Sequence, residues 1–239
     1  AVQLEVPIHS GHTIGTDVIV GSFSGDTKLT LPIDQVLEKD SHKDDFIENS
    51  EFNLTVSTTP FLRMSGGIAY LLQYPYGCIE QTSSRLLPLV ALRGLIDEGH
   101  IPGITTASAN KYIKAGVDRL FMMQTESGGF GYWPGNKNPH MMGTLYAMAA
   151  LSIAKKNGVD VPEERMQKSV SYLKNLINTN ESLDKTFVAF GSYILSLNDA
   201  FDSPNENFLR RVSGKSTEAE MFMLLARNNS GFPVKQKVE

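Results

Sequence analysis

Residues 74–81 read YPYGCIEQ and lie where one helical pattern ends and another begins. Within this stretch Cys78 and Gln81 are three residues apart, so on a helical turn their side chains lie on the same side and within reach of each other. Gly77 can take a backbone conformation closed to other residues, and Pro75 stiffens the approach. We therefore expect a turn that leads into a helix with a cysteine and a glutamine side by side at its start.

This pairing has a specific chemistry. A thiolate is a good nucleophile, and the N-terminus of a helix favours the charged form of a thiol. The side-chain amide of Gln81 is an acyl group, so displacement of ammonia by the thiolate of Cys78 would produce an intramolecular thioester between the two residues. The alternative is that Cys78, the single cysteine of the chain, packs as a small hydrophobe, which is the usual fate of a buried free cysteine.

The chain differs in character on either side of residue 60. Residues 1–60 predict a β segment with four strands, because apolar and polar residues alternate there, and residues 61–239 predict an α-helical domain with a 3.6-residue apolar period. Short connections rich in Gly and Pro favour antiparallel helical hairpins. Two apolar stripes predict helices: Met142, Leu145, Tyr146, Ala149, Ala150 and Ile153, and then Met166, Val170, Leu173 and Ile177. Further helices are predicted at 62–73, 79–98, 105–124, 184–197, 205–212 and 216–228.

The composition argues against several classes of protein. The 239 residues carry 22 basic and 26 acidic side chains, a formal charge of −4, whereas a nucleic-acid-binding domain shows a basic face. The longest apolar run, residues 86–92, contains Pro88 and is too short to span a membrane. A single cysteine excludes an internal disulfide framework. We expect no cofactor and no metal site, and no signal peptide within these residues.

The motif at residues 74–81 resembles the thioester signature P-Y-G-C-x-E-Q of the alpha-2-macroglobulin and complement family. The continuation at residues 82–88, TSSRLLP, is similar to the bacterial members, and so is Ile79 at a position where animal members carry glycine. Residues 128–134 and 144–147 look like the second helical hairpin of the family. The resemblance implies a mainly α fold, an α/α toroid that is truncated at its C-terminus and preceded by a small antiparallel CUB-like β segment.

The same resemblance implies a protease inhibitor fragment rather than an enzyme. In the family a protease cuts a bait region, the molecule rearranges, and the exposed thioester acylates a lysine of the attacker. Cys78 would supply the sulfur leaving group, and Gln81 the carbonyl that stays attached to the target through an amide or ester. The expected partners are target proteases and the remaining domains of a parent protein in the periplasm, at the cell envelope or outside the cell.

Other residues of the motif have two interpretations each. Gly77 and Glu80 match the family pattern, and Glu80 is either a helix-start carboxylate or a group with a chemical role. Tyr74 and Tyr76 either shield the thioester from water or pack as core aromatics.

A histidine separates two modes of reaction in the family. Complement members that prefer hydroxyl groups carry one on a later hairpin, which by motif order would fall near residues 184–187, where the chain has none. His140 is interpreted as a helix-start or loop histidine. We therefore expect direct attack on the thioester by amines.

Two other functions remain open. Residues 124–140 resemble the repeats of terpene cyclases and of the β subunits of protein prenyltransferases, which share the toroid. A prenyltransferase needs an Asp, Cys and His zinc set, and Cys78 is the only cysteine and lies near a different hairpin. The second alternative is an α/α-toroid interaction module without a functional thioester.

Overall fold

The computed structural model describes residues 24–26, 28, 77–101, 103–202, 212 and 216–232. The chain divides into two units, residues 1–54 and 55–239, and all the described helices belong to the second. The predicted strands of the β segment lie almost wholly outside the described residues, as do the predicted helix at 62–73 and most of that at 205–212. The assignment of a CUB-like segment therefore stays a prediction.

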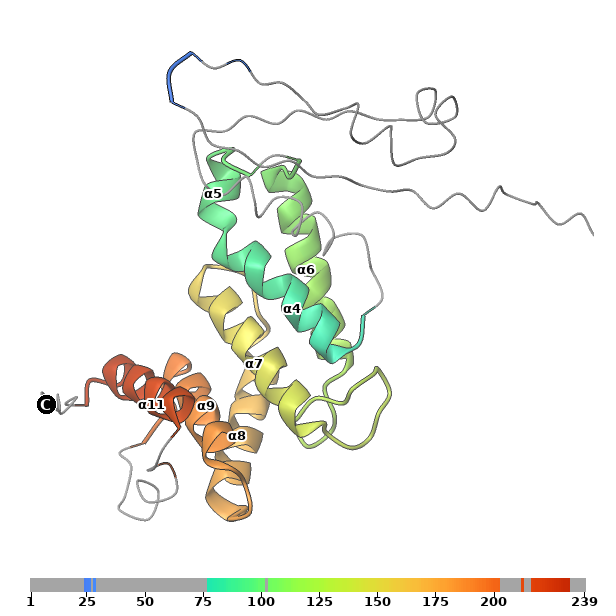
Figure 1. Cartoon of the computed structure of the whole chain (residues 1–239). Coiled ribbons are helices and arrows are strands. Elements are labelled where there is room, and N and C mark those ends of the chain that lie inside the picture. The colour runs from blue at the N-terminus through green and yellow to red at the C-terminus, as the bar shows by residue number, and fades with distance from the viewer. Residues whose placement is uncertain are drawn as a thin grey trace, which may run out of the picture. The chain divides into compact units, whose positions relative to one another are not determined.

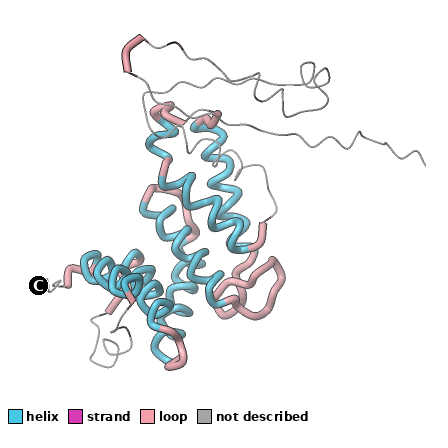
Figure 2. The backbone as a smooth tube through the Cα atoms, viewed as in Figure 1, coloured by secondary structure: helices cyan, strands magenta, loops and turns pink. Residues whose placement is uncertain are grey.

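The described part of the second unit is helical, as Figures 1 and 2 show. Its helices are α4 (Ile79–Ala91), α5 (Arg93–Asp97), α6 (Thr106–Met122), α7 (Met141–Lys156), α8 (Glu163–Thr179), α9 (Lys185–Leu197) and α11 (Thr217–Asn229). Helix α4 packs on α7, α7 packs on α9, and α9 packs on α11. Helix α6 packs on α4, and α8 packs on α7 and α9. This arrangement of successive helical hairpins is the one predicted for an α/α toroid, and no described helix is both long and apolar enough to cross a membrane.

The predicted helix at 79–98 is wrong in one respect, because the chain breaks it into α4 and α5 at Leu92. Leu92 has φ −98° and ψ 6°, outside the helical region, and lies between Pro88 and Gly94. Proline lacks a backbone N–H and glycine has a weak helix propensity, so the hydrogen-bond ladder is weakest there.

The buried faces predicted from the two apolar stripes differ in how well the structure matches them. All four residues of the second stripe are buried in α8, as the period predicted. In α7 the helix was predicted correctly but its buried face was not: Met142 is 39% exposed and Tyr146 40% exposed, while the run Ala147–Ser152 is buried throughout. Helices on several sides of α7 account for this, because α4, α8 and α9 all pack against it.

Candidate functional site

The motif lies at the N-terminus of α4, as its spacing predicted. Cys78 is the N-cap residue, with an extended backbone, and Gln81 is the third residue of the helix. The Gln81 side chain folds back so that its Oε1 accepts a hydrogen bond of 3.1 Å from the backbone N–H of Cys78. The Cys78 side chain faces the backbone N–H of Gln81 in return, which completes a capping box. The two groups of the proposed thioester are therefore held together at one end of one helix.

The two residues differ in their access to solvent. Cys78 is only 5% exposed and is a free thiol, whereas Gln81 is exposed. The helix dipole places partial positive charge at this end of α4. A buried cysteine thus lies next to an exposed glutamine at this helix end.

Gly77 is required for space rather than for an unusual backbone conformation. It is not among the described glycines with positive φ, contrary to the expectation from its residue type. A Cβ atom at Gly77 would lie 2.7 Å from Cβ of Gln81, and 3.3 Å from both the backbone N and Oγ1 of Thr82. The contact with Gln81 is too short for any real pair of carbons, so only glycine lets the Gln81 side chain fold back over the cap.

Three further contacts fix the backbone around the cysteine. The hydroxyl of Thr82 donates to the carbonyl of Cys78 at 2.9 Å, and Nη2 of Arg119 on α6 donates to the carbonyl of Gly77 at 3.4 Å. The backbone N–H of Ile79 donates to the carbonyl of Tyr132 at 3.1 Å. The third bond pairs one of the N–H groups that a helix start leaves unsatisfied.

Tyr132 belongs to the long loop between α6 and α7, drawn in pink in Figure 2. The loop turns back on itself through an antiparallel bridge between Gln124 and Phe130. Phe130 is fully buried, and its N–H donates to Oγ1 of Thr144 on α7 at 2.9 Å. Tyr132 follows this anchor by two residues, which brings it to the start of α4.

The Tyr132 side chain contacts Glu80 of the motif, and its pKa responds to Cys78. Its hydroxyl donates to Oε2 of Glu80 at 3.4 Å. The pKa of Tyr132 is raised to about 12, first because its hydroxyl hydrogen-bonds the Cys78 side chain and next because negative charge on Cys78 and Glu80 disfavours a phenolate. Sequence reasoning missed this role, although Tyr132 lies within the family-like motif at 128–134.

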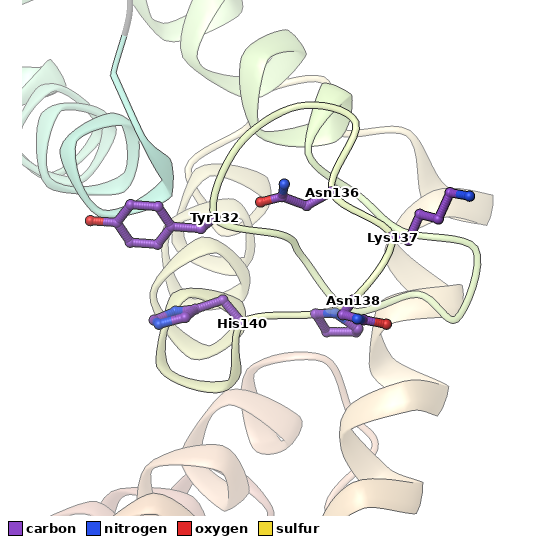
Figure 3. Close-up of a pocket in the computed structure, with 6 residues that line it drawn as sticks. Tyr132, Asn136, Lys137, Asn138 and His140 are labelled. Carbon is purple, nitrogen blue, oxygen red and sulfur yellow. The ribbon is translucent and has the colours of Figure 1, made fainter.

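His140 is the N-cap of α7, which confirms its interpretation as a helix-start histidine. Its Nδ1 accepts from the N–H of Gly143 at 3.0 Å, and its ring lies 5.1 Å from that of Tyr132 in an edge-on arrangement. Figure 3 shows the two rings on the same side of the loop, whereas Lys137 points away. These residues line an open pocket of about 330 Å³.

The starts of α4 and α7 also touch directly. Ile79 is fully buried, and a Cβ atom on Gly143 would lie 2.6 Å from its Cγ2 atom. Glycine at the start of α7 therefore allows the close approach that brings the loop to the motif.

Two predicted site residues, Tyr74 and Tyr76, lie outside the described residues. Glu80 is exposed in the first turn of α4 and contacts Tyr132, so it is not merely a solvated helix-start carboxylate. Within the described ranges no three His, Cys, Asp or Glu residues gather as a metal ion would require.

Comparisons with known proteins match this fold and the stretch of sequence that contains the site. Residues 52–186, more than half of the chain, match the family model for the A-macroglobulin TED domain. Alpha-2-macroglobulin of Thermotoga maritima is 31% identical over 153 residues, which cover 62% of this chain and 9% of that protein. The Escherichia coli protein of the same name is 33% identical over 119 residues, 49% of this chain and 7% of its own length.

A solved structure gives the same relationship in three dimensions. Salmonella alpha-2-macroglobulin that had reacted with methylamine superposes with a TM-score of 0.60 at 26% identity, over 73% of this chain and 12% of that one. The chain thus spans less than a tenth of the length of the two relatives compared by sequence. The helical hairpins and the Cys78–Gln81 cap agree with the matched family model. The chain therefore belongs to the alpha-2-macroglobulin family and carries its thioester domain.

Proposed function

We propose that Cys78 and Gln81 form an internal thioester, and that the chain is the reactive part of a larger protease inhibitor. The observation that supports this best is the cap itself. The Gln81 side chain is folded onto the backbone N–H of Cys78 at 3.1 Å, with the cysteine sulfur at the same helix end. A glutamine that pointed into solvent would have to be ordered before the thiolate could reach its carbonyl carbon, whereas this one is already in place.

The formation of the bond balances without any other reagent. The thiolate attacks the side-chain carbonyl carbon of Gln81, the carbon–nitrogen bond breaks, and ammonia leaves with the proton of the thiol. In the reverse sense, an amine attacks the same carbon, the carbon–sulfur bond breaks, and the free thiol of Cys78 is restored. The product is an amide between Gln81 and the amine.

The geometry favours amines as the attacking groups. The Gln81 residue is exposed while Cys78 is buried, so an amine would approach from the side of Gln81. Nδ1 of His140 is engaged with the N–H of Gly143, and its ring packs on Tyr132. The use of methylamine with the Salmonella relative is consistent with this chemistry.

In the parent protein this reaction would capture proteases. Cleavage of a bait region by the protease would expose the thioester, and a lysine of the protease would then be acylated. The acyl group is consumed once, so the chain is an inhibitor and not an enzyme. We place the parent in the periplasm, at the cell envelope or outside the cell of a bacterium, on the strength of the family and its bacterial relatives.

The test is the intact mass of the freshly purified protein before and after methylamine. We expect a mass one ammonia below that of the sequence, which rises by one methylamine as the thiol of Cys78 becomes titratable. Cys78→Ala and Gln81→Leu should each show the full sequence mass and no reaction with methylamine.

A wild-type mass equal to that of the sequence, with Cys78 already free and methylamine without effect, would contradict the thioester in this chain. The interaction-module interpretation would then take its place.

A further inference from the structure

The hydroxyl of Tyr132 lies at the start of α4, next to Glu80. It donates to Oε2 of Glu80 at 3.4 Å, and Cys78, two residues before Glu80, is the first cause of the raised pKa of Tyr132. The backbone of the same tyrosine is tied to α4 through its carbonyl, which accepts from the N–H of Ile79 at 3.1 Å. Tyr132 is therefore held at the motif by main chain and side chain together.

A phenol has one proton to donate, so it can serve only one strong acceptor at a time. Because the pKa of Tyr132 is raised to about 12, the phenol keeps this proton at neutral pH. An acylated sulfur is neutral and a weak acceptor, whereas a thiolate is charged and a strong one. The preferred acceptor therefore depends on whether the thioester is closed or open.

We propose that Tyr132 is a catalytic residue of the thioester, whose hydroxyl donates to Glu80 while the sulfur is acylated and to the sulfur of Cys78 as an amine displaces it. Glu80 is then a positioning residue, which keeps the phenol turned toward the motif. This inference rests on the proposed thioester function.

The step balances in atoms and electrons. The nitrogen of the amine bonds to the carbonyl carbon of Gln81, and the pair of the carbon–sulfur bond moves to the sulfur of Cys78. The proton that the amine loses ends on the thiol or in solvent, and Tyr132 keeps its own. The tyrosine thus lowers the free energy of the departing thiolate by a hydrogen bond to a charged atom.

Other charged and titratable groups surround this place. Glu80 on α4 opposes negative charge on the sulfur, while the Arg119 guanidinium on α6, bonded to the carbonyl of Gly77, favours it. The His140 ring at the start of α7 lies against the Tyr132 ring. Glu80 and Tyr132 therefore affect the thiolate in opposite directions, and this difference can be measured.

The experiment measures the rate at which methylamine releases the Cys78 thiol at pH 7. Tyr132→Phe keeps the ring that packs against His140 and removes only the hydroxyl. We expect it to slow opening about tenfold, the size of one hydrogen bond to a charged group. Tyr146→Phe is the matched control, because this exposed tyrosine of α7 pairs with Phe190, and its rate should equal that of the wild-type protein.

Glu80→Gln should change the rate of opening in the opposite direction. It removes a negative charge beside the sulfur while an amide oxygen remains as an acceptor, so opening should become faster by about two- to fivefold. A purely structural role of the loop would slow both variants. Glu80→Gln also carries the test if Tyr132→Phe fails to form a thioester.

A second readout uses the opened protein. Alkylation of the freed thiol by iodoacetamide should be slower in Tyr132→Phe than in the wild-type protein at pH 7.

The outcomes separate this inference from the function on which it rests. If the wild-type protein lacks the ammonia loss, both are overturned. If the thioester is present but Tyr132→Phe opens and alkylates at the wild-type rate, or if Glu80→Gln opens no faster, only the role of Tyr132 is overturned.

Discussion

The helices α4 and α6 start with the same local arrangement and differ in everything around it. At α6 the N-cap Thr105 and the third residue Ser108 form a reciprocal capping box, with N–H to hydroxyl distances of 3.0 and 3.1 Å. At α4 the same positions hold Cys78 and Gln81, and Gln81 Oε1 lies 3.1 Å from the capped N–H. The bonds of the α6 cap are exposed, whereas Cys78 is buried and the preceding carbonyl of Gly77 accepts a hydrogen bond from Arg119 of α6. A capping box is thus common geometry, and in the proposed thioester it would become reactive only with a nucleophile, an acyl group and protection from water.

The largest effect is expected when the residues of the α6 capping box replace those of the α4 capping box. Cys78→Thr with Gln81→Ser should abolish the thioester completely, because nucleophile and acyl group are both gone. The helix should remain capped, since threonine is a good N-cap whose replacement by alanine costs about 1 kcal/mol. Intact mass measures the first effect and thermal unfolding the second.

The reverse exchange tests whether a Cys–Gln pair has to be protected from water. Thr105→Cys with Ser108→Gln creates a Cys–Gln box at the exposed start of α6. We expect no second ammonia loss to accumulate, because water reaches that site. Peptide mapping that located an ammonia loss at residue 105 would show that residue types and spacing are enough.

A smaller effect follows from the close approach at Gly77. Gly77→Ala brings a Cβ atom within 2.7 Å of Cβ of Gln81, the root of a side chain that cannot swing away. We expect destabilisation of about 1–3 kcal/mol from overpacking, together with loss of most of the thioester. Denaturant unfolding and intact mass measure the two effects.

Gly94 of α5 is the matched control, because an added Cβ meets nothing within 4 Å there. Gly94→Ala should stabilise the protein by about 0.5–1 kcal/mol, since alanine is the better helix former, and should leave the thioester intact. Equal behaviour of the two variants would contradict the steric role of Gly77.

The same distinction between local and distant contacts separates what the sequence predicted from what it did not. The Cys78–Gln81 cap follows from a spacing of three, and the buried face of α8 follows from a regular period, so both could be read from neighbouring residues. Tyr132 lies more than fifty positions from Cys78, and only the folded loop brings it there. No period or spacing encodes such a contact, although the family-like motif at 128–134 marked the segment.

Other differences have the same cause. The buried face of α7 depends on how many helices surround it, which its own sequence does not state. Gly77 was correctly singled out as special, but the reason is the position of the Gln81 side chain and not the glycine backbone.

The last expected effect concerns the titration of Tyr132 and sharpens the contrast between a buried and an exposed cap. The pKa of Tyr132 is raised to about 12 from an ordinary value of 10.0, first by its bond to Cys78. Cys78→Ala should therefore lower this pKa toward 10, and Glu80→Gln should lower it less. Carbon-13 NMR of labelled tyrosine, with Tyr132→Phe to assign the signal, measures the shift.

The sign of the linked stability follows from the raised value. Below pH 10 Tyr132 is protonated in folded and unfolded chains alike, and its contribution is complete. Between pH 10 and about 12 the unfolded chain releases this proton first, so the contribution falls as pH rises. Because a thioester sulfur carries no charge, the closed protein should titrate like Cys78→Ala, and opening by methylamine should raise the pKa of Tyr132. An unchanged pKa on opening would mean that the phenol does not respond to the sulfur.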